Sequence, residues 1–490
     1  MTDDAEPRFR YEEIADLIAG LVAEGTLAPG TRAPSLRELC RQQRTSLTTA
    51  LQAYRVLEDR GVLQARPQSG FYVAPARPAL PLPATTRPPP RPSAVAVSQL
   101  MLQMVEHASD PRYVPLGCAI PSPALLASGK LDRMLARLAR TRGLQHNTYG
   151  PLRGEAALRT EIARRALRWG QALAPDDIAI TCGATEALSL ALGTVARRGD
   201  TVAVESPTYF GLLQVLRMQG LKALELPTDA HTGVVVDALG KALQAQRIAA
   251  CVLSSSFNNP LGCTMPEPDK REVLALLARH QVPLIEDDVY GDIHADRPGA
   301  ERPRPFSAFD RAGQVIYCGS FSKTLAPGYR IGWVATRRHL PGILEAKFAS
   351  TLCGPVLPQL ALAEFLASGG YDHHLRRLRA AFSDTLRRMA GVIEASFPAG
   401  TRVSQPAGGF VLWLELPRAL DAGRLFTQAL DKRICFAPGA VFSAGGRHAH
   451  CLRLSGGHGW DARIEKGLRA LGAMATAAAA AAAARPASRR

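Results

Sequence analysis

Hydrophobic residues near the start of the chain recur at the spacing of one helix face. They fall at i, i+3, i+4, i+7 and i+8, as Ile14, Leu17, Ile18, Leu21 and Val22. This period predicts an amphipathic helix, because residues at these intervals share one side of a 3.6-residue repeat.

The next fifty residues predict two more helices and a two-stranded wing. Pro29-Gly30 marks a turn, and Ser35 lies three residues before Glu38, a capping box that starts a helix at SLRELC. A third helix, SLTTALQAYRVLEDRG, closes at Gly61, and the β-prone pieces VLQAR and GFYVA follow, joined by PQSG. We therefore expect a winged helix-turn-helix over residues 1–75.

A change of composition separates this head from the rest of the chain. Between Pro75 and Pro92, eight of eighteen residues are proline, with almost nothing apolar to bury. Proline fixes φ and lacks a backbone donor, so residues 76–93 are expected to form a semi-extended linker. At the far end, residues 473–490 form an Ala-rich, Arg-ended tail that we expect to be disordered.

Short apolar runs alternate with helical patterns over residues 94–472. The runs are IAITCG, TVAVESP, AACVLSSS, VPLIEDD and QVIYCGS, while residues 155–170 and 185–197 have helical periodicity. Strands that alternate with helices predict βαβ units and a mostly parallel sheet, hence an α/β body. Ligands bind such sheets at the carboxyl ends of the strands, where several of these runs end in Gly, Ser, Asp or Pro.

Composition narrows the class of protein. The chain has 490 residues, a formal net charge of +16, and nine scattered cysteines without a CxxC pair or a zinc-like spacing. No apolar signal peptide opens it, and no uncharged run reaches the roughly 18 apolar residues of a membrane helix. We expect a soluble cytoplasmic protein with reduced thiols, no metal site and affinity for polyanions.

The head has a local surplus of arginine that favours phosphate contacts. Residues 32–66 hold seven arginines against Glu38, Glu58 and Asp59. The alternative is a small protein-binding or dimerising winged helix whose arginines are merely solvated. Our candidate contacts to double-stranded DNA are Arg32, Ser35, Arg37, Ser46, Thr48, Thr49, Gln68 and Ser69.

The head resembles the GntR family of bacterial regulators over residues 9–74. The resemblance rests on LAPGTRAPSLREL, on TTALQAYRVLEDRGVL and on the wing ARPQSGFYV. Many members have arginine directly after the Ser or Thr that opens the recognition helix, but this chain has Leu47. Base readout through that side chain is therefore lost, and the operator sequence cannot be transferred from relatives.

A single lysine in the body, Lys323, has unusual neighbours in the stretch SFSKTLAPGYRIGW. Ser320, Ser322 and Arg330 together offer two hydroxyls and a guanidinium, which suit a phosphate dianion. A lone lysine is usually a solvated charge, but an amine beside a phosphate site suggests an imine with pyridoxal 5′-phosphate (PLP).

Three further stretches agree with a PLP site. Asp287 and Tyr290 lie in IEDDVYGD, where an aspartate could keep the cofactor's pyridine nitrogen protonated. Asn259 in SSSFNNPLG could donate to the ring hydroxyl, as could Tyr290. TCGATEAL runs from a strand through Gly183 into a helix at Ala184-Thr185, an anion site. Each stretch also has an ordinary alternative. Asp287 could be a helix N-cap, Asn259 could belong to an Asn-Pro turn, and TCGATEAL by itself is only a weak Gly-rich loop.

Together these stretches resemble the fold-type I aminotransferases over residues 95 to 470. The resemblance implies a large α/β domain, a smaller α+β C-terminal subdomain at about 360–472, and a homodimer with shared active sites. It implies that Lys323 forms the Schiff base and Asp287 binds the pyridine nitrogen. Tyr209 in ESPTYFG would stack on the ring, Tyr149 in NTYGPLRG would reach a phosphate across the dimer, and Arg453 in CLRLSGG would bind a substrate α-carboxylate. The remaining cofactor contacts would be Asn259 and Tyr290 at the ring hydroxyl, and Ala184, Thr185, Ser320, Ser322 and Arg330 at the phosphate.

A GntR-like head, a proline-rich linker and an aminotransferase-like body resemble the MocR subfamily of transcription regulators. This resemblance implies a DNA-binding regulator whose body senses an amino acid, an amine or PLP itself. The alternative is a working PLP-dependent aminotransferase, with a 2-oxo acid as amino acceptor and Lys323 as general base. A DNA-binding protein whose body is only a dimerisation scaffold is disfavoured by the intact set of pocket residues.

Overall fold

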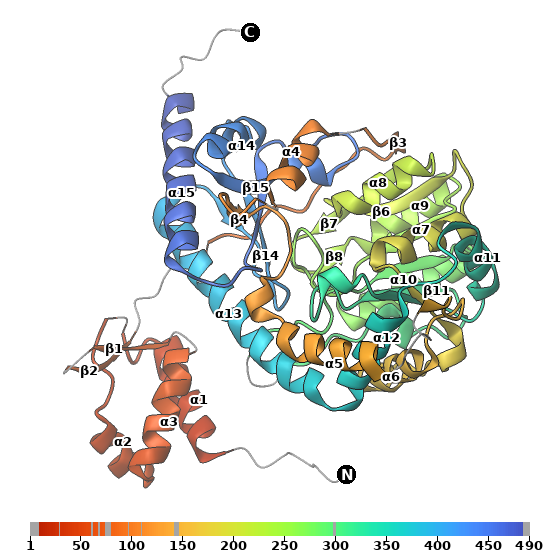
Figure 1. The fold of residues 1–490 in the computed structure, drawn as a ribbon. Coiled ribbons are helices and arrows are strands. Elements are labelled where there is room, and N and C mark those ends of the chain that lie inside the picture. The colour runs from red at the N-terminus through yellow and green to blue at the C-terminus, as the bar shows by residue number, and fades with distance from the viewer. Residues whose placement is uncertain are drawn as a thin grey trace. The chain divides into compact units, whose positions relative to one another are not determined.

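The chain folds into two compact units, one over Met1–Ala79 and one over Leu80–Arg490 (Figure 1). The structure is a computed structural model. It describes residues 9–28, 30–59, 62–66, 69–73, 80–96, 98–108, 110–141, 147–296 and 300–483.

The head is the predicted winged helix-turn-helix. Its elements are α1 (Arg10–Ala23), α2 (Leu36–Gln43), α3 (Leu47–Asp59), β1 (Leu63–Arg66) and β2 (Gly70–Val73). Ile14 and Ile18 of the predicted apolar face pack with Tyr54 and Leu57 of α3 in one core, whereas Leu17 is 46% exposed. The predicted capping box at the start of α2 is present.

A large mixed sheet forms the centre of the body. Its strands run in the order β3-β7-β6-β9-β10-β11-β12-β5, with β8 beside β7. The pairs from β7 to β11 are parallel, while β12 is antiparallel to both β11 and β5. The mostly parallel α/β sheet is thus confirmed. The strands are β3 (Ser93–Ala94), β5 (Ile178–Thr181), β6 (Thr201–Ser206), β7 (Lys222–Asp229), β8 (Gly233–Val234), β9 (Ala250–Leu253), β10 (Leu284–Asp287), β11 (Val315–Ser320) and β12 (Gly332–Ala335).

Helices cover both faces of this sheet, because successive residues of a strand point to opposite sides. Val202 and Val204 of β6 pack with α7, α8 and α11, while Ala203 packs with α9 and α10. Both faces are therefore buried, and a ligand can reach the sheet only at strand ends. The helices are α5 (Ser128–Thr141), α6 (Ala156–Ala166), α7 (Ala184–Val195), α8 (Phe210–Met218), α9 (Val236–Ala245), α10 (Glu267–Arg279), α11 (Leu340–Ser350) and α12 (Val356–Ala367).

The smaller subdomain is built around a second sheet, in the order β13-β14-β16-β15-β4. One of its strands comes from before the large sheet, since β4 pairs with β15 in parallel. The C-terminal subdomain predicted at about 360–472 is therefore incomplete, because β4, which comes much earlier in the sequence, also belongs to it. The elements are β4 (Val114–Leu116), β13 (Arg402–Val403), β14 (Val411–Glu415), β15 (Ile434–Pro438), β16 (Cys451–Ser455), α4 (Gln99–Ala108), α13 (Gly370–Ser396), α14 (Ala422–Asp431) and α15 (Ala462–Ala483).

The proline-rich segment differs from the predicted spacer. Its residues from Leu80 onward belong to the body, where Thr86 Oγ1 donates to the Ser206 backbone oxygen at 2.6 Å. The Thr228 backbone N–H donates to Thr86 Oγ1 at 2.9 Å, and Ala84 N–H donates to Glu415 Oε2 at 3.0 Å. Residues 80–84 thus contact the small subdomain and residues 85–94 the large sheet. Their semi-extended conformation is held by the body rather than by proline alone.

The C-terminal alanines also differ from the prediction. Helix α15 continues to Ala483, and Ala475 is fully buried against the small subdomain. Apolar contacts on one face keep this stretch helical, so the expected disorder is wrong for residues 473–483. Residues 484–490 lie outside the described part. Among the described residues, no helix is both long and apolar enough to cross a lipid bilayer.

Candidate functional site

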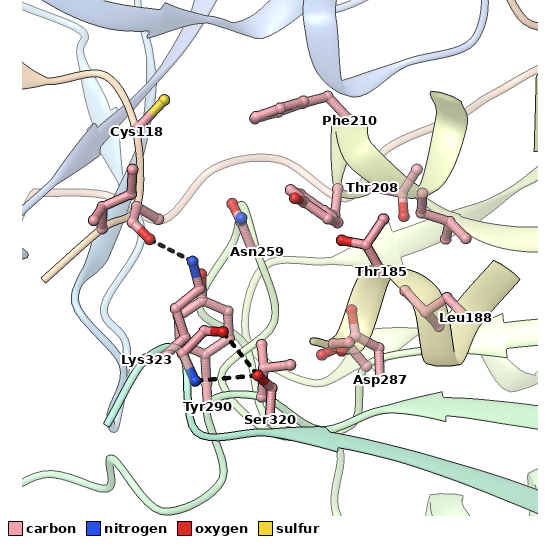
Figure 2. A pocket seen from close by; sticks show the side chains of 18 of the residues that line it. Cys118, Thr185, Leu188, Thr208, Phe210, Asn259, Asp287, Tyr290, Ser320 and Lys323 are labelled. Carbon is pink, nitrogen blue, oxygen red and sulfur yellow. Dashed lines mark hydrogen bonds between the residues drawn. The ribbon is translucent and has the colours of Figure 1, made fainter. Parts of the chain in front are cut away.

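A pocket of about 410 Å³ opens at the carboxyl ends of the central strands. Figure 2 shows Asp287, Asn259, Ser320 and Lys323 converging on it. Asp287 ends β10 and Ser320 ends β11, so the sheet itself brings together residues that are far apart in sequence. The predicted residues that line this pocket are Ala184, Thr185, Tyr209, Asn259, Asp287, Tyr290, Ser320, Ser322, Lys323, Arg330 and Arg453.

Lys323 follows β11 and points into the pocket. Its Nζ donates a hydrogen bond to the Ala119 backbone oxygen at 2.6 Å. Burial lowers the pKa of Lys323 to about 8, and the guanidinium of Arg453 acts in the same direction. A larger fraction of this amine is therefore neutral at neutral pH than for an ordinary lysine, which favours attack on a carbonyl.

The phosphate-type cradle is made by Gly183, Arg330 and two serines. Gly183 is the N-cap of α7 with φ +79°, and a Cβ there would collide with the Arg330 guanidinium. Arg330 Nη1 donates to Ser322 Oγ at 3.3 Å, and Ser320 Oγ lies 2.9 Å from Ser322 Oγ. A helix N-terminus, a guanidinium and two hydroxyls thus face one small volume, which is the donor set of an anion site.

Asp287 is half-buried beside the pocket, and one of its oxygens is buried and unsatisfied. Its Oδ1 has no hydrogen-bond partner among the described residues. Burial, together with the neighbouring Asp288 carboxylate, raises the pKa of Asp287 to about 7. A protonated ring nitrogen would provide both the missing donor and a compensating charge, so this carboxylate fits the pyridine nitrogen of PLP.

Arg453 is fully buried on β16, and no carboxylate of the described residues pairs with it. Its Nη1 donates to Asn259 Oδ1 at 3.3 Å, its Nη2 donates to the Gly117 backbone oxygen, and Nε has no partner among the described residues. Its guanidinium also lies 5.4 Å from the ring centroid of Phe442. An unpaired buried guanidinium is costly, so this one is suited to an incoming anion.

Tyr209 and Tyr149 have different surroundings. Tyr209 lines the pocket as the N-cap of α8, and burial raises its pKa to about 12. Tyr149 does not line the pocket and is 85% exposed. Its expected contact with a phosphate across a dimer interface stays a prediction.

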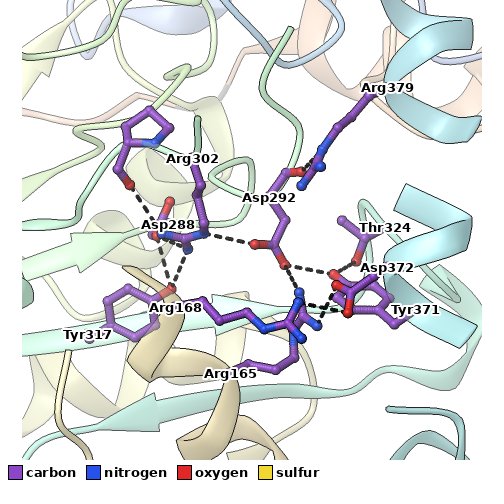
Figure 3. A network of polar contacts seen from close by, with 11 residues as sticks. Arg165, Arg168, Asp288, Asp292, Arg302, Tyr317, Thr324, Tyr371, Asp372 and Arg379 are labelled. Atoms are coloured by element: carbon purple, nitrogen blue, oxygen red, sulfur yellow. Dashed lines mark hydrogen bonds and ion pairs between the residues drawn. The ribbon is translucent and has the colours of Figure 1, made fainter. Parts of the chain in front are cut away.

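A network of ion pairs adjoins the pocket on the side of α6 and α13 (Figure 3). Arg302 pairs with Asp288 at 2.7 Å and with Asp292 at 2.8 Å. Tyr371 OH donates to Asp292 Oδ2 at 2.8 Å and lies 3.0 Å from Thr324 Oγ1. Since Asp288 and Thr324 directly follow Asp287 and Lys323, this network holds the backbone on which the two pocket residues stand.

Other pocket residues were not found from the sequence. Glu205 lies at the pocket four residues before Tyr209, within ESPTYFG, so that stretch could have indicated it. Burial raises its pKa to about 8. Ala119 is 204 residues from Lys323 and has no motif around it, so only the fold could place it there. Apolar residues that also line the pocket include Val105, Cys118, Ile120 and Phe210.

The head places several candidate DNA residues in local hydrogen bonds. Ser35 Oγ accepts from the Glu38 backbone N–H at 3.2 Å, and Ser46 Oγ lies 2.8 Å from Thr49 Oγ1. Ser69 Oγ lies 2.7 Å from the hydroxyl of Tyr72. These hydroxyls therefore support helix ends and the wing, whether or not they also touch DNA.

The exposed side chains of the head are better candidates for phosphate or base contacts. Arg32, Arg37 and Thr48 are exposed, and Leu47, the first residue of α3, is 58% exposed. Gln68 lies outside the described residues. The DNA contacts stay predictions.

Comparison with known proteins decides the family. Residues 10–73 match "Bacterial regulatory proteins, gntR family" and residues 125–471 match "Aminotransferase class I and II". A protein of Escherichia coli K12, named an uncharacterized HTH-type transcriptional regulator, YdcR, is 39% identical over 95% of this chain and 98% of its own. The chain belongs to the MocR subfamily of GntR-type transcription regulators.

Other relatives of this MocR-type chain are named as aminotransferases. The 2-aminoadipate transaminase of Thermus thermophilus is 31% identical over 76% of this chain and 92% of its own. A solved structure of LysN, the alpha-aminoadipate aminotransferase of that organism, superposes with a TM-score of 0.72 at 29% identity, over 79% of this chain and 97% of the other. That structure is complexed with N-(5′-phosphopyridoxyl)-L-leucine. The fold-type I body is thus confirmed.

Proposed function

We propose that this transcription regulator binds PLP in the body pocket and responds there to an amino acid or amine that alters DNA binding by the head. The observation that supports it best is the set of ionisable groups around one pocket: an amine that points into it, a half-buried carboxylate and a fully buried guanidinium. Among the described residues, Lys323 Nζ donates to a backbone oxygen, Asp287 Oδ1 has no hydrogen-bond partner, and Arg453 donates to uncharged acceptors.

PLP would supply an aldehyde for amines and a ring that withdraws electrons. Lys323 would hold the cofactor covalently, and Asp287 would keep a proton on the ring nitrogen. Arg330, Ser320, Ser322 and the N-terminus of α7 would bind the phosphate. Tyr209 would pack on the ring, while Asn259 and Tyr290 would orient its hydroxyl.

Regulation requires that the effector bind two arrangements of the protein with different affinities. Fold-type I pockets of this kind are shared between two subunits, so we propose a homodimer in which the partner's Tyr149 completes the phosphate site. Paired heads would then read the two halves of one operator.

The test uses purified full-length protein. Wild type should show the visible or near-ultraviolet absorbance of bound PLP, and Lys323→Ala should abolish it; a colourless wild type after PLP addition would refute the proposal. Arg37→Ala and Thr48→Ala should weaken binding to DNA from its own promoter region and leave the absorbance unchanged. Unaltered DNA binding in both variants would refute the assignment of these contacts.

A second candidate function is transamination, favoured by the complete pocket and by the transaminase relative. Lys323 could move a proton as general base once an incoming amine has displaced it. Steady turnover of an amino acid with a 2-oxo acid, at rates of about 1 s⁻¹ or more, without any shift of promoter DNA, would favour this candidate.

A further inference from the structure

One end of the pocket is apolar. Figure 2 shows Cys118 and Phe210 at the end away from Ser320 and Asp287. Val105 of α4 and Ile120 line the pocket as well, and they are 46% and 40% exposed. Half-exposed apolar side chains at a pocket mouth are surface that a ligand would remove from water.

The segment 117–120 runs past the two groups that would hold an amino acid. The Gly117 backbone oxygen accepts from Arg453, and the Ala119 oxygen accepts from Lys323 Nζ at 2.6 Å. An effector whose carboxylate and amine meet these two groups therefore has its α-carbon beside this segment. Its side chain then faces the apolar end, where Cys118 and Ile120 lie.

Aromatic rings continue this wall. Phe210 lies 5.0 Å from Tyr209 and 5.7 Å from Phe442, centroid to centroid. Phe442 in turn lies below the guanidinium of Arg453. The surface next to the carboxylate site is thus made of rings and aliphatic groups.

Within the described part of this chain, no charged side chain at the pocket is left over for an effector's side chain. Among the described residues, the charged ones that line it are Glu205, Asp287, Lys323, Arg330 and Arg453. Arg330 belongs to the cradle, Arg453 to the carboxylate, and Asp287 to the ring. Glu205 accepts from the Ser254 backbone N–H at 3.3 Å, and burial raises the pKa of the Cys118 thiol, which keeps it neutral.

We propose that the effector is an α-amino acid with an uncharged, apolar side chain, and that Val105, Ile120 and Phe210 form its side-chain subsite. This inference rests on the proposed function. A second carboxylate or an ammonium group would lose hydration against these apolar side chains without gaining a charged partner from this chain, which a pocket rejects more strongly than a change of size.

The experiment is a calorimetric titration of full-length, PLP-loaded protein with L-leucine, L-phenylalanine, L-aspartate, L-glutamate and L-lysine, with cofactor absorbance as a second readout. L-Leucine and L-aspartate are the decisive pair, because their side chains branch at the same carbon and differ in charge. We expect L-leucine to bind about 100-fold more tightly. Equal or tighter binding of L-aspartate would overturn the inference.

A matched pair of variants locates the subsite on α4. Val105→Arg places a cation in the pocket and should tighten L-aspartate or L-glutamate at least about tenfold while weakening L-leucine. Leu102→Arg lies one turn earlier, is 55% exposed and does not line the pocket, so it should change neither. An unchanged ranking in Val105→Arg, or the same change in both variants, would overturn the assignment.

Failure of this inference differs from failure of the proposed function. Preferred binding of L-aspartate by a protein with the cofactor absorbance refutes the apolar subsite alone. A protein without that absorbance refutes the cofactor proposal, and a loaded protein that binds none of these amino acids refutes both the carboxylate site and the subsite.

Discussion

Arg453 is fully buried in the body and the side chain of Arg302 is 12% exposed, but their charges meet different partners. Arg302 pairs with Asp288 and Asp292 at 2.7 and 2.8 Å. Arg453 donates to Asn259 Oδ1 and to a backbone oxygen, both uncharged. We predict that Arg302→Met lowers the stability of the fold much more than Arg453→Met does, whereas Arg453→Met is the variant that weakens effector binding.

The magnitudes follow from what each substitution leaves behind. Arg302→Met leaves the buried carboxylate of Asp288 without its cation and removes one of the two arginines that pair with Asp292, which costs about 3–5 kcal/mol of folding free energy. Arg453→Met leaves two uncharged acceptors unpaired, at about 1–3 kcal/mol each. It also removes a buried guanidinium whose desolvation costs several kcal/mol. These two contributions oppose each other, so the net change in stability should be within about 1–2 kcal/mol of zero.

For effector binding we expect the reverse order, with the larger loss in Arg453→Met. Two charge-assisted hydrogen bonds to a carboxylate contribute about 1.5–3 kcal/mol each, so Arg453→Met should raise the effector Kd at least about 100-fold. The assays are urea unfolding of the PLP-free proteins and calorimetric titration of the loaded ones. A fall in the urea midpoint for Arg453→Met as large as that for Arg302→Met would refute the reasoning, because Arg453 would then have a structural counter-charge.

Three further predictions concern the cofactor cradle, the lysine and the docked linker. Gly183→Ala should weaken PLP binding at least about tenfold, because the added Cβ collides with Arg330. The control is Gly199→Ala, at φ +91° with nothing within 4 Å, which should leave PLP affinity unchanged. Equal PLP affinities of the two variants in a fluorescence titration would contradict the prediction. The rate of PLP uptake by the empty protein should rise with pH and level off above about 8, because only the neutral Lys323 amine attacks; a stopped-flow midpoint near that of free lysine would disprove the shift. Thr86→Val removes the side-chain hydrogen bonds to Ser206 and Thr228, so the backbone N–H of residue 86, which donates to the Thr228 oxygen, should exchange with deuterium about tenfold faster. An unchanged exchange rate would show that the segment is held by other contacts.

Much of the site could be predicted because its chemistry is local in sequence. Ser320, Ser322, Lys323 and Arg330 lie within eleven residues, and a turn after a strand brings such neighbours together in most folds. The capping box of α2 was predictable for the same reason, since its hydrogen bonds join residues three apart. Local spacing therefore indicates which groups gather, and often what they bind.

Burial and long-range pairing had to come from the tertiary structure. Among the described residues, Arg453 donates to uncharged acceptors, and one of them, the Gly117 backbone oxygen, is 336 residues away in sequence. The pairing of β4 with β15 and the docking of Thr86 on β6 and β7 join segments that have no shared pattern. Likewise, the alanines of α15 are ordered by the core they cover rather than by their own composition.

The sequence by itself therefore determined the head, the alternation of strands and helices, and the chemical types around Lys323, because periodicity and short spacing act within one element or one turn. Only the tertiary structure decided which charges stay unpaired, which wall of the pocket is apolar, and where the linker ends. Those properties depend on desolvation, which is set by everything that packs around a group rather than by its neighbours along the chain.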